Sequence, residues 1–208
     1  MKTVIVVSAG EGPPVEVAGD VVVAADGGLE RALAIGLRPD VVVGDLDSVD
    51  ATRLSEAERD GVEVVRYPAA KDATDLELAL DHARGLGAGR VVVVASGGGR
   101  LDHLLASCLG LAAPALGETI VDAHVGDALV HVVRGTRRLR GVVGETLTLL
   151  AVNGDAQGVR TSGLLYPLAG ETLEAGSSRG VSNVLTSEEV EIAVERGVVL
   201  AIRPGAER

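Results

Sequence analysis

The first half of the chain alternates short apolar runs with amphipathic segments. The apolar runs, most of them rich in valine, predict strands at residues 4–7, 21–25, 41–43, 62–67 and 90–95. The amphipathic segments predict helices at residues 29–35, 51–60, 74–84 and 102–113. Because strands that are apolar throughout are typical of sheets buried on both faces, we predict a mostly parallel sheet covered by helices.

The pattern changes after about residue 118, where helical periodicity ends. Short strand patterns follow at residues 120–125, 128–133, 136–139, 146–151, 173–174, 191–194 and 198–202. Turn residues separate them, namely Gly126-Asp127, Gly135, Gly141, Asn153-Gly154 and Gly197. Many short strands with regular turns predict an antiparallel β-sandwich or barrel, of which we take the sandwich. We therefore expect an α/β chain with one domain at residues 1–118 and a β-sandwich domain at residues 119–208.

Composition narrows the classes of partner. The formal net charge of −11 provides no long-range attraction for nucleic acid or for an anionic membrane. No apolar run approaches 18 residues, and Met1-Lys2-Thr3 leads directly into a strand pattern without the features of a signal peptide. We therefore expect a cytoplasmic protein without nucleic-acid or membrane partners. The two aromatic residues, Tyr67 and Tyr166, leave little for a ring-shaped ligand to stack on.

The first acidic motif is Gly44-Asp45-Leu46-Asp47-Ser48, which follows the strand at residues 41–43. If the strand persists, Asp45 and Asp47 point to the same face and overlook the crevice at the carboxyl end of a parallel sheet. Two carboxylates this close repel each other unless a cation lies between them, and a divalent metal is the natural cation. The alternative is an acidic turn in which Asp47 or Ser48 caps the next helix.

The second motif is Lys71-Asp72-Ala73-Thr74-Asp75. Thr74 and Glu77 fit a capping box, which places Asp75 in the first turn of a helix, where a carboxylate interacts well with the helix dipole. That is a sufficient structural reason for Asp75, and a metal–phosphate role is the alternative. Lys71 is either a compact positive charge placed beside two aspartates or an ordinary surface lysine.

The third motif is Ser96-Gly97-Gly98-Gly99-Arg100-Leu101-Asp102-His103, between a strand and a helix. Glycines allow backbone amides to approach a phosphate, and Arg100 can hold phosphate oxygens in a bidentate manner. A tight turn, with Asp102 simply starting the helix, is the alternative. The Asp26-Gly27-Gly28 junction is similar, and is either a second wall of a nucleotide crevice or a plain turn.

In the second half, two small polar segments attract attention. Ser182 and Asn183 offer neutral hydrogen-bonding groups suited to the edge of an uncharged heterocycle, and Tyr166 lies in a nearby turn-like segment. The alternative is that both segments are ordinary loops between strands, since such loops have the same composition.

Taken in order, these segments resemble the thiamine pyrophosphokinase family. The residues that carry the resemblance are Ala25-Asp26-Gly27-Gly28, Pro39-Asp40, Gly44-Asp45-Leu46-Asp47-Ser48, Lys71-Asp72-Ala73-Thr74-Asp75, Gly98-Gly99-Arg100-Leu101-Asp102-His103, Gly163-Leu164-Leu165-Tyr166-Pro167-Leu168 and Ser182-Asn183. The match spans nearly the whole chain, and the order of the motifs is more specific than any one of them.

The resemblance implies an α/β ATP-binding catalytic domain followed by a β-sandwich domain for thiamine binding and dimerisation, in a homodimer. It implies Mg²⁺-dependent transfer of pyrophosphate from ATP to the hydroxyl of thiamine, which gives thiamine diphosphate and AMP. The metal and catalytic carboxylates would be Asp45, Asp47 and Asp75, with Asp102 beside them. ATP would contact Asp26, Gly27, Gly28, Lys71, Asp72, Gly98, Gly99 and Arg100. Thiamine would contact Tyr166, Ser182 and Asn183.

Three other functions stay open. The first is a sister pyrophosphokinase that acts on a hydroxymethyl pterin, and the second is a non-enzymatic sensor of nucleotide or thiamine. The third is a phosphatase of the haloacid dehalogenase type, since an apolar strand precedes Asp45-Leu46-Asp47. The sequence also leaves open whether Asp47 or Asp75 accepts the proton of the attacking hydroxyl.

Overall fold

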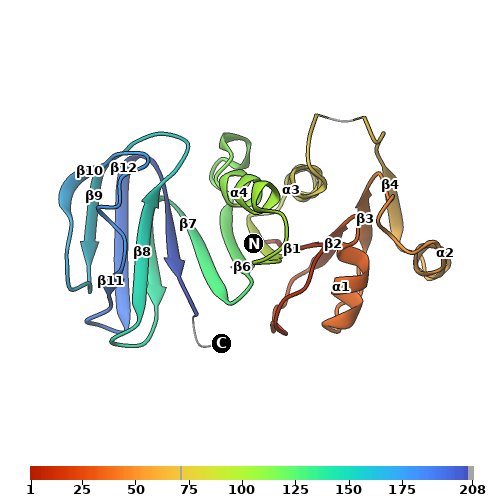
Figure 1. Ribbon diagram of the computed structural model, residues 1–208, viewed down its shortest axis with the longest axis horizontal. Helices are drawn as coiled ribbons and strands as arrows, with labels where there is room; N and C mark the ends of the chain where they lie inside the picture. The colour runs from red at the N-terminus through yellow and green to blue at the C-terminus, as the bar shows by residue number, and fades with distance from the viewer. Residues whose placement is uncertain (71, 206–208) are drawn as a thin grey trace. The chain divides into compact units, whose positions relative to one another are not determined.

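The computed structural model describes residues 1–70 and 72–205, and Lys71 lies outside the described residues. The chain divides into two compact units (Figure 1). The first comprises Met1–Gly110 and Pro114–Gly126, and the second comprises Leu111–Ala113 and the chain from Asp127 onward.

The first unit is built on a parallel sheet. Its strands are β1 (Thr3–Ser8), β2 (Val21–Ala25), β3 (Val41–Gly44), β4 (Glu63–Arg66), β5 (Arg90–Ala95) and β6 (Ile120–Val125). They follow the order β6-β5-β1-β2-β3-β4, and each neighbouring pair is parallel. The valine-rich centres of β1, β2, β3 and β5 are buried, as expected for a sheet covered on both faces, while Val64 and Val65 of the edge strand β4 are half-buried. The predicted parallel sheet is confirmed.

Helices lie on both sides of this sheet: α1 (Gly28–Ala34), α2 (Ala51–Arg59), α3 (Asp75–Gly85) and α4 (Leu101–Gly110), followed by the short 3₁₀ helix η1 (Pro114–Leu116). Figure 1 shows α1 on one side and α3 with α4 on the other. The direction of strand order reverses after β4, because β5 returns to pair with β1. Right-handed connections then place the later helices on the opposite face. Ligands of such sheets bind outside the carboxyl ends of the strands, near the reversal.

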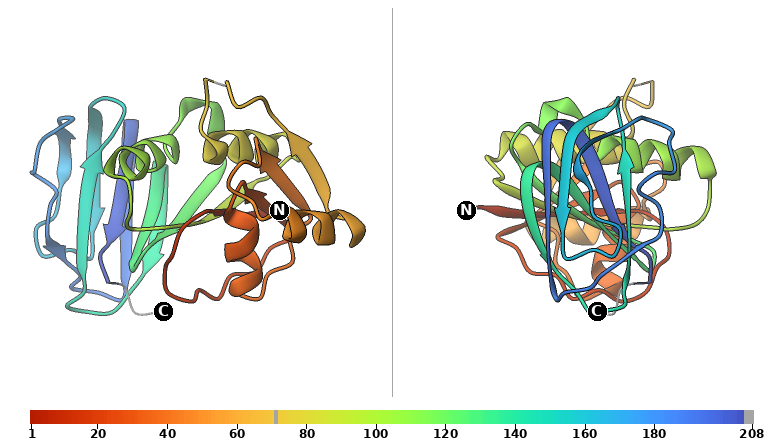
Figure 2. Two further views of the ribbon diagram at one scale, coloured as in Figure 1. Left: turned by 45° about the vertical axis from the view of Figure 1, so that its right-hand side comes forward. Right: turned by 90° about the vertical axis from the view of Figure 1, so that its left-hand side faces the viewer.

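The second unit is antiparallel. Its strands are β7 (Ala128–Arg140), β8 (Thr146–Ala151), β9 (Ala156–Ser162), β10 (Ala169–Leu173), β11 (Asn183–Val184) and β12 (Glu189–Arg203). β12 pairs with β7, β8 and β9, while β10 pairs with β9 and β11 with β8 (Figure 2). Alternate residues of β12, such as Val190 and Ile192, enter a core that includes Leu147 and Leu149 of β8. The predicted antiparallel unit is confirmed.

Several strand predictions need correction. Residues 120–125 were expected among the antiparallel strands, whereas β6 pairs in parallel with β5 at six consecutive positions from Arg90↔Ile120 to Ala95↔Val125. Gly135 and Gly197 were expected to separate strands, but they lie inside the continuous strands β7 and β12, at the register shift between Val194 and Val199. Glycines with positive φ can serve as bulges as well as turns, which explains the difference. The strands β9 and β11 were not predicted.

In the part of the chain that the structure describes, every helix is too short or too polar to cross a membrane.

Candidate active site

Three aspartates meet at the carboxyl ends of β2 and β3. Asp26 directly follows β2, and Asp45 and Asp47 follow β3. One carboxylate oxygen from each residue lies within 4.8 Å of the other two. Asp26 is buried, Asp45 is half-buried and Asp47 is exposed. A set of carboxylate oxygens that is open on one side suits a hard divalent cation that keeps part of its hydration shell. The predicted pair therefore gains Asp26 as a third member.

Asp75 reaches the same place from α3. The helix begins at Asp75, and the Thr74 hydroxyl caps it by accepting a hydrogen bond from the Glu77 N–H at 3.2 Å. A Cβ added to Gly44 would lie 2.9 Å from Asp75 Oδ1 and 3.1 Å from Asp26 Cβ. The two aspartates thus flank Gly44, and a side chain at position 44 would intrude between them.

The environment of Asp26 favours a cation beside it. Burial raises the pKa of Asp26 from its ordinary value of 3.8, and the nearby Asp75 and Asp45 raise it further, against hydrogen bonds from the Gly27 N–H and Ser48. Among the described residues, its buried Oδ1 has no hydrogen-bond partner. A buried carboxylate without a full set of partners is costly, and a bound cation would remove that cost. The pKa shift and the unsatisfied oxygen both fit a metal ligand.

Leu46 lies between Asp45 and Asp47 and anchors the loop that carries them. Its backbone is left-handed, with φ of 65°, which is strained for a leucine. Its side chain is buried in a cluster that includes Leu29 of α1, Val42 of β3 and Leu54 of α2. Burial of the side chain therefore offsets the backbone strain and fixes the loop that carries Asp45 and Asp47.

Replacing Leu46 by alanine is expected to destabilise the protein by about 2–4 kcal/mol, because a cavity forms while the strained backbone stays. Denaturant unfolding measures the loss. The control is Leu33→Ala, at a leucine of α1 that is 43% exposed and should lose less than about 1 kcal/mol. Equal stability of the two variants would contradict this role for Leu46.

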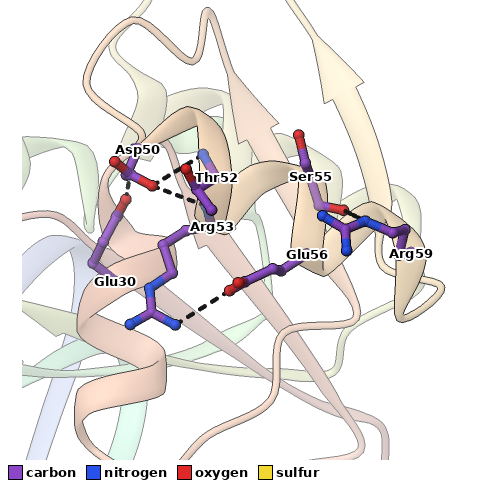
Figure 3. Close-up of polar contacts among 7 residues, drawn as sticks. All are labelled: Glu30, Asp50, Thr52, Arg53, Ser55, Glu56 and Arg59. Atoms are coloured by element: carbon purple, nitrogen blue, oxygen red, sulfur yellow. Dashed lines mark hydrogen bonds and ion pairs between the residues drawn. The ribbon is translucent and has the colours of Figure 1, made fainter.

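The far end of the same loop is fixed by polar contacts (Figure 3). Asp50 caps α2 by accepting hydrogen bonds from the N–H groups of Thr52 and Arg53, each at 3.0 Å. The Asp50 N–H donates to Glu30 Oε1 of α1 at 2.9 Å. Since Glu30 lies four residues after Asp26, this bond ties the loop of Asp45 and Asp47 to the helix that follows Asp26.

The glycine loop follows β5 at the same edge of the sheet. A Cβ on Gly97 would lie 2.9 Å from the Cα of Gly126, so Gly97 is required by packing. Gly98 and Gly99 face open space, and the Gly99 φ of 85° favours glycine. Both glycines are exposed, and the Gly98 N–H donates to Ser96 Oγ at 3.2 Å. The open space beside them is what a loop that contacts a phosphate requires.

Arg100 and Asp102 pair with each other. Arg100 donates to both carboxylate oxygens of Asp102, at 3.2 Å from Nε and 2.6 Å from Nη2. This contact lowers the pKa of Asp102 to about 2. Asp102 is therefore placed as the partner of Arg100, while the candidate metal cluster consists of Asp26, Asp45 and Asp47 among the described residues. A phosphate held by Arg100 would compete with Asp102 for the same guanidinium.

The other residues predicted to contact ATP say less about a nucleotide site. Gly28 has no room for a side chain, because its Cβ would lie 2.0 Å from the Val7 carbonyl oxygen, which gives this glycine a packing role. Gly27 is the N-cap of α1, and Asp72 is exposed in the loop before α3. Lys71 lies outside the described residues.

The three predicted acceptor residues lie together in the second unit. Tyr166 is exposed, Ser182 is exposed with a left-handed φ of 57°, and Asn183 is buried. The Asn183 amide bonds the backbone: Oδ1 accepts from the N–H groups of Tyr166 and Val184, and Nδ2 donates to the Tyr166 carbonyl. Asn183 was expected to offer its amide to a heterocycle, whereas the structure shows most of that amide already engaged.

Sequence reasoning missed parts of the site. Asp26 was assigned to the nucleotide alone, although its position after an apolar strand matches that of Asp45 and could have suggested a shared cluster. The supporting roles of Leu46 and Glu30 have no signal in the sequence, because they depend on contacts between α1, α2 and the loop.

Comparisons with known proteins agree with this arrangement. Residues 17–118 match the family model described as thiamin pyrophosphokinase, catalytic domain, and residues 131–199 match thiamin pyrophosphokinase, vitamin B1 binding domain. A curated thiamine pyrophosphokinase of Bacillus subtilis (strain 168) is 25% identical over 182 residues, which cover 86% of this chain and 84% of the relative.

Solved structures show the same fold. A thiamine pyrophosphokinase from Bacillus subtilis superposes with a TM-score of 0.85 at 22% identity, covering 99% of this chain and 100% of that one. Thiamin pyrophosphokinase from Candida albicans superposes with a TM-score of 0.79 at 16% identity, covering 98% and 89%.

Together with the fold and the acidic site, the matches to the family model and to its relatives show that this protein is an enzyme of the ATP-dependent diphosphotransferase class. More particularly, the chain belongs to the thiamin pyrophosphokinase family.

Proposed function

We propose that this chain transfers the pyrophosphoryl group of ATP to the hydroxyl of thiamine, with Mg²⁺ as the cofactor. The observation that carries the proposal is the cluster of Asp26, Asp45 and Asp47, flanked by Asp75, at the carboxyl edge of the parallel sheet. The accessible glycine loop with Arg100 follows β5 at the same edge. Positioning and neutralisation of a polyphosphate require this combination of groups.

The cluster fits Mg²⁺ by its chemistry. All its donors are carboxylate oxygens, and Asp26 contributes a buried oxygen without a hydrogen-bond partner among the described residues. Asp26, Asp45 and Asp47 would hold the ion, with Asp75 beside them. Mg²⁺ supplies neutralisation of the charge on the phosphate oxygens and so removes repulsion from the acidic edge.

The chain's own groups complete the reaction. The thiamine hydroxyl oxygen attacks the β-phosphorus, the bond from that phosphorus to the oxygen bridging to the α-phosphate breaks, and AMP leaves. Asp75 or Asp47 accepts the hydroxyl proton. Gly98, Gly99 and Arg100 hold the phosphates, and Arg100 exchanges Asp102 for a phosphate oxygen as ATP binds.

The acceptor is assigned to the second unit. Tyr166, Ser182 and Asn183 cluster there, within the residues matched by the vitamin B1 binding domain. We assign ATP binding and catalysis to residues 1–118 and thiamine binding to residues 119–208, which the spans of the two family models support. In the fold, β6 at residues 120–125 belongs to the first unit. The dimer contacts, expected in residues 119–208, are placed instead on α4, for the reason given below.

The acceptor test compares AMP release from Mg-ATP with thiamine, with a hydroxymethyl pterin and with no acceptor. The proposal predicts AMP release that requires thiamine. Release with the pterin alone would overturn the choice of acceptor and keep the reaction type. Tight ligand binding without AMP release under any condition would replace the enzyme with a sensor.

We also propose that the chain acts as a homodimer. Within residues 101–110, all of them described, α4 has no buried residue although it is rich in apolar side chains. Leu101, Leu105 and Leu109 recur every four residues along one face and are 67%, 55% and 48% exposed. An uncovered apolar face of this kind is typical of an interface with another protein surface, and a second copy supplies one.

Replacing Leu105 by glutamate is expected to raise the dimer dissociation constant by at least about a hundredfold, because the substitution buries a charge at the interface. Sedimentation equilibrium measures it. The matched control is Leu33→Glu, at an exposed leucine on α1 of the same unit. An unchanged mass for Leu105→Glu, or a monomeric wild type, would contradict the placement of α4 at the interface.

A further inference from the structure

Asn183 is a buried polar residue in a segment that is otherwise joined by backbone pairing. It is 4% exposed and pairs through its backbone with Leu147 of β8. The following residues pair with the loop that leads to Tyr166: the Leu165 N–H donates to the Val184 carbonyl at 2.9 Å, and Leu164 bridges Leu185. This pairing brings the segment from Gly163 against the segment at residues 183–186.

At Tyr166 the side chain of Asn183 takes over the pairing. Its Oδ1 accepts from the Tyr166 N–H at 3.0 Å, and its Nδ2 donates to the Tyr166 carbonyl at 2.7 Å. The amide therefore binds both backbone groups of one residue, as a neighbouring peptide of a strand would. Oδ1 also accepts from the Val184 N–H at 2.9 Å, which fixes the orientation of the amide.

The hydrogen-bonding capacity of asparagine limits what is left for a ligand. The amide has two acceptor sites on its oxygen and two N–H donors. The three bonds occupy both acceptor sites and one donor. At most one N–H can face a bound molecule, so Asn183 is poorly suited to read a heterocycle directly.

Tyr166 is the side chain that this amide sets in place. It is 57% exposed, while its backbone is held by Asn183. It lies beside the exposed apolar side chain of Leu165, and Val181 near Asn183 is also exposed. Since Tyr166 is the one aromatic residue of the second unit, it is the natural surface for a flat cationic ring.

We propose that Asn183 is a positioning residue that determines affinity for the acceptor by clamping the backbone of Tyr166, rather than by contacting the acceptor. This inference rests on the proposed function. It assigns ring recognition to Tyr166, and it assigns to Asn183 the rigidity that lets Tyr166 bind without further ordering cost.

The test is a double-mutant cycle on the KM for thiamine, measured through AMP release by the full chain. Asn183→Asp keeps the acceptor oxygen and replaces the donor to the Tyr166 carbonyl with a repelling oxygen. Tyr166→Ala removes the ring. Each single variant should raise the KM for thiamine about tenfold while the KM for ATP changes less than about twofold. The double variant should be little worse than Tyr166→Ala alone.

The chain's other asparagine, which is exposed, offers a control for the same chemical change. Asn153 also donates from Nδ2 to a backbone carbonyl, that of Ala112 at 3.0 Å, in the same unit. Asn153→Asp should leave the KM for thiamine unchanged, even where thermal unfolding shows a similar loss of stability. If both asparagine variants raise the two KM values alike, a general structural role replaces the clamp.

The remaining outcomes are distinct. If the double variant raises the KM for thiamine by the product of the two single effects, Asn183 and Tyr166 act independently and the clamp is overturned. The proposed function would still stand in that case, provided that the wild type releases AMP only with thiamine. A wild type that releases no AMP with thiamine would overturn the proposed function and, with it, this inference.

Discussion

Replacing Asp45 or Asp47 by asparagine is expected to lower the turnover number for AMP formation by about a thousandfold or more. Both carboxylates lie in the cluster whose oxygens are within 4.8 Å of one another. An amide has the same size but no charge, so the variant loses attraction for a divalent cation and leaves the charge of the polyphosphate uncompensated. Steady-state kinetics at saturating ATP and thiamine measure the effect.

Asp81→Asn is the matched control for this prediction. Asp81 lies on α3, is exposed, and pairs with Arg84 at the protein surface. Its replacement should change turnover less than about twofold, because a surface ion pair contributes little. If the Asp45 and Asp47 variants keep the turnover of Asp81→Asn, the cluster is not the centre of the reaction.

Asp26→Asn is expected to abolish turnover and, at neutral pH without divalent cations, to raise the midpoint of thermal unfolding. Asp26 is buried, and its Oδ1 has no hydrogen-bond partner among the described residues. The wild type bears the cost of this buried charge, whereas the asparagine variant does not. A gain in stability with a loss of function is typical of a residue kept for catalysis or binding.

The pH dependence follows from the direction of the shift. Burial raises the pKa of Asp26 above its ordinary value of 3.8, so the folded protein holds this proton more tightly than the unfolded chain does. The contribution of Asp26 to stability therefore falls as pH rises from its ordinary pKa through the raised one, and is constant above it. The stability advantage of Asp26→Asn should grow across that range in EDTA.

Mg²⁺ should reverse this order. Binding to the folded wild type stabilises it by RT ln(1 + c/Kd), where c is the concentration of free Mg²⁺, while the variant has lost a ligand and binds the ion more weakly. Differential scanning calorimetry in EDTA and in MgCl₂ measures both effects. A variant that is less stable than the wild type in EDTA, or one that Mg²⁺ stabilises equally, would contradict the assignment of Asp26.

Local sequence patterns predict much of the first unit. The strand at Val21–Ala25 was predicted with the observed ends, and the Thr74 cap of α3 was predicted from a four-residue motif. Both features depend on residues adjacent in sequence. The direction of β6 was not predictable in this way, because it depends on pairing with β5, whose final residue precedes β6 by 25 positions.

The second unit shows where such patterns stop being informative. Gly135 and Gly197 look like turn residues, but long-range pairing between β7 and β12 keeps them within strands. β9 was missed because Gly158, with a φ of 65°, interrupts the alternation of buried and exposed positions. Tertiary pairing overrides local preference in both cases.

In the candidate site too, features set by neighbouring residues were predictable and features set by long-range contacts were not. The aspartates at the ends of β2 and β3 and at the start of α3 were recognisable because each follows an apolar run or a cap. The pairing of Arg100 with Asp102, the anchoring of Leu46 and the use of the Asn183 amide by the backbone are properties of folded contacts. Residue type and the resemblance predict a ligand role for Asn183, whereas the fold shows three hydrogen bonds between its amide and the backbone.

The most direct measurement follows AMP and thiamine diphosphate together, from Mg-ATP and thiamine, for the wild type, Asp75→Asn and Asp81→Asn. We predict equal amounts of the two products with the wild type and with Asp81→Asn, and a loss of both in a folded Asp75→Asn variant. Formation of ADP in place of AMP, or undiminished products with Asp75→Asn, would contradict pyrophosphoryl transfer at this carboxylate site.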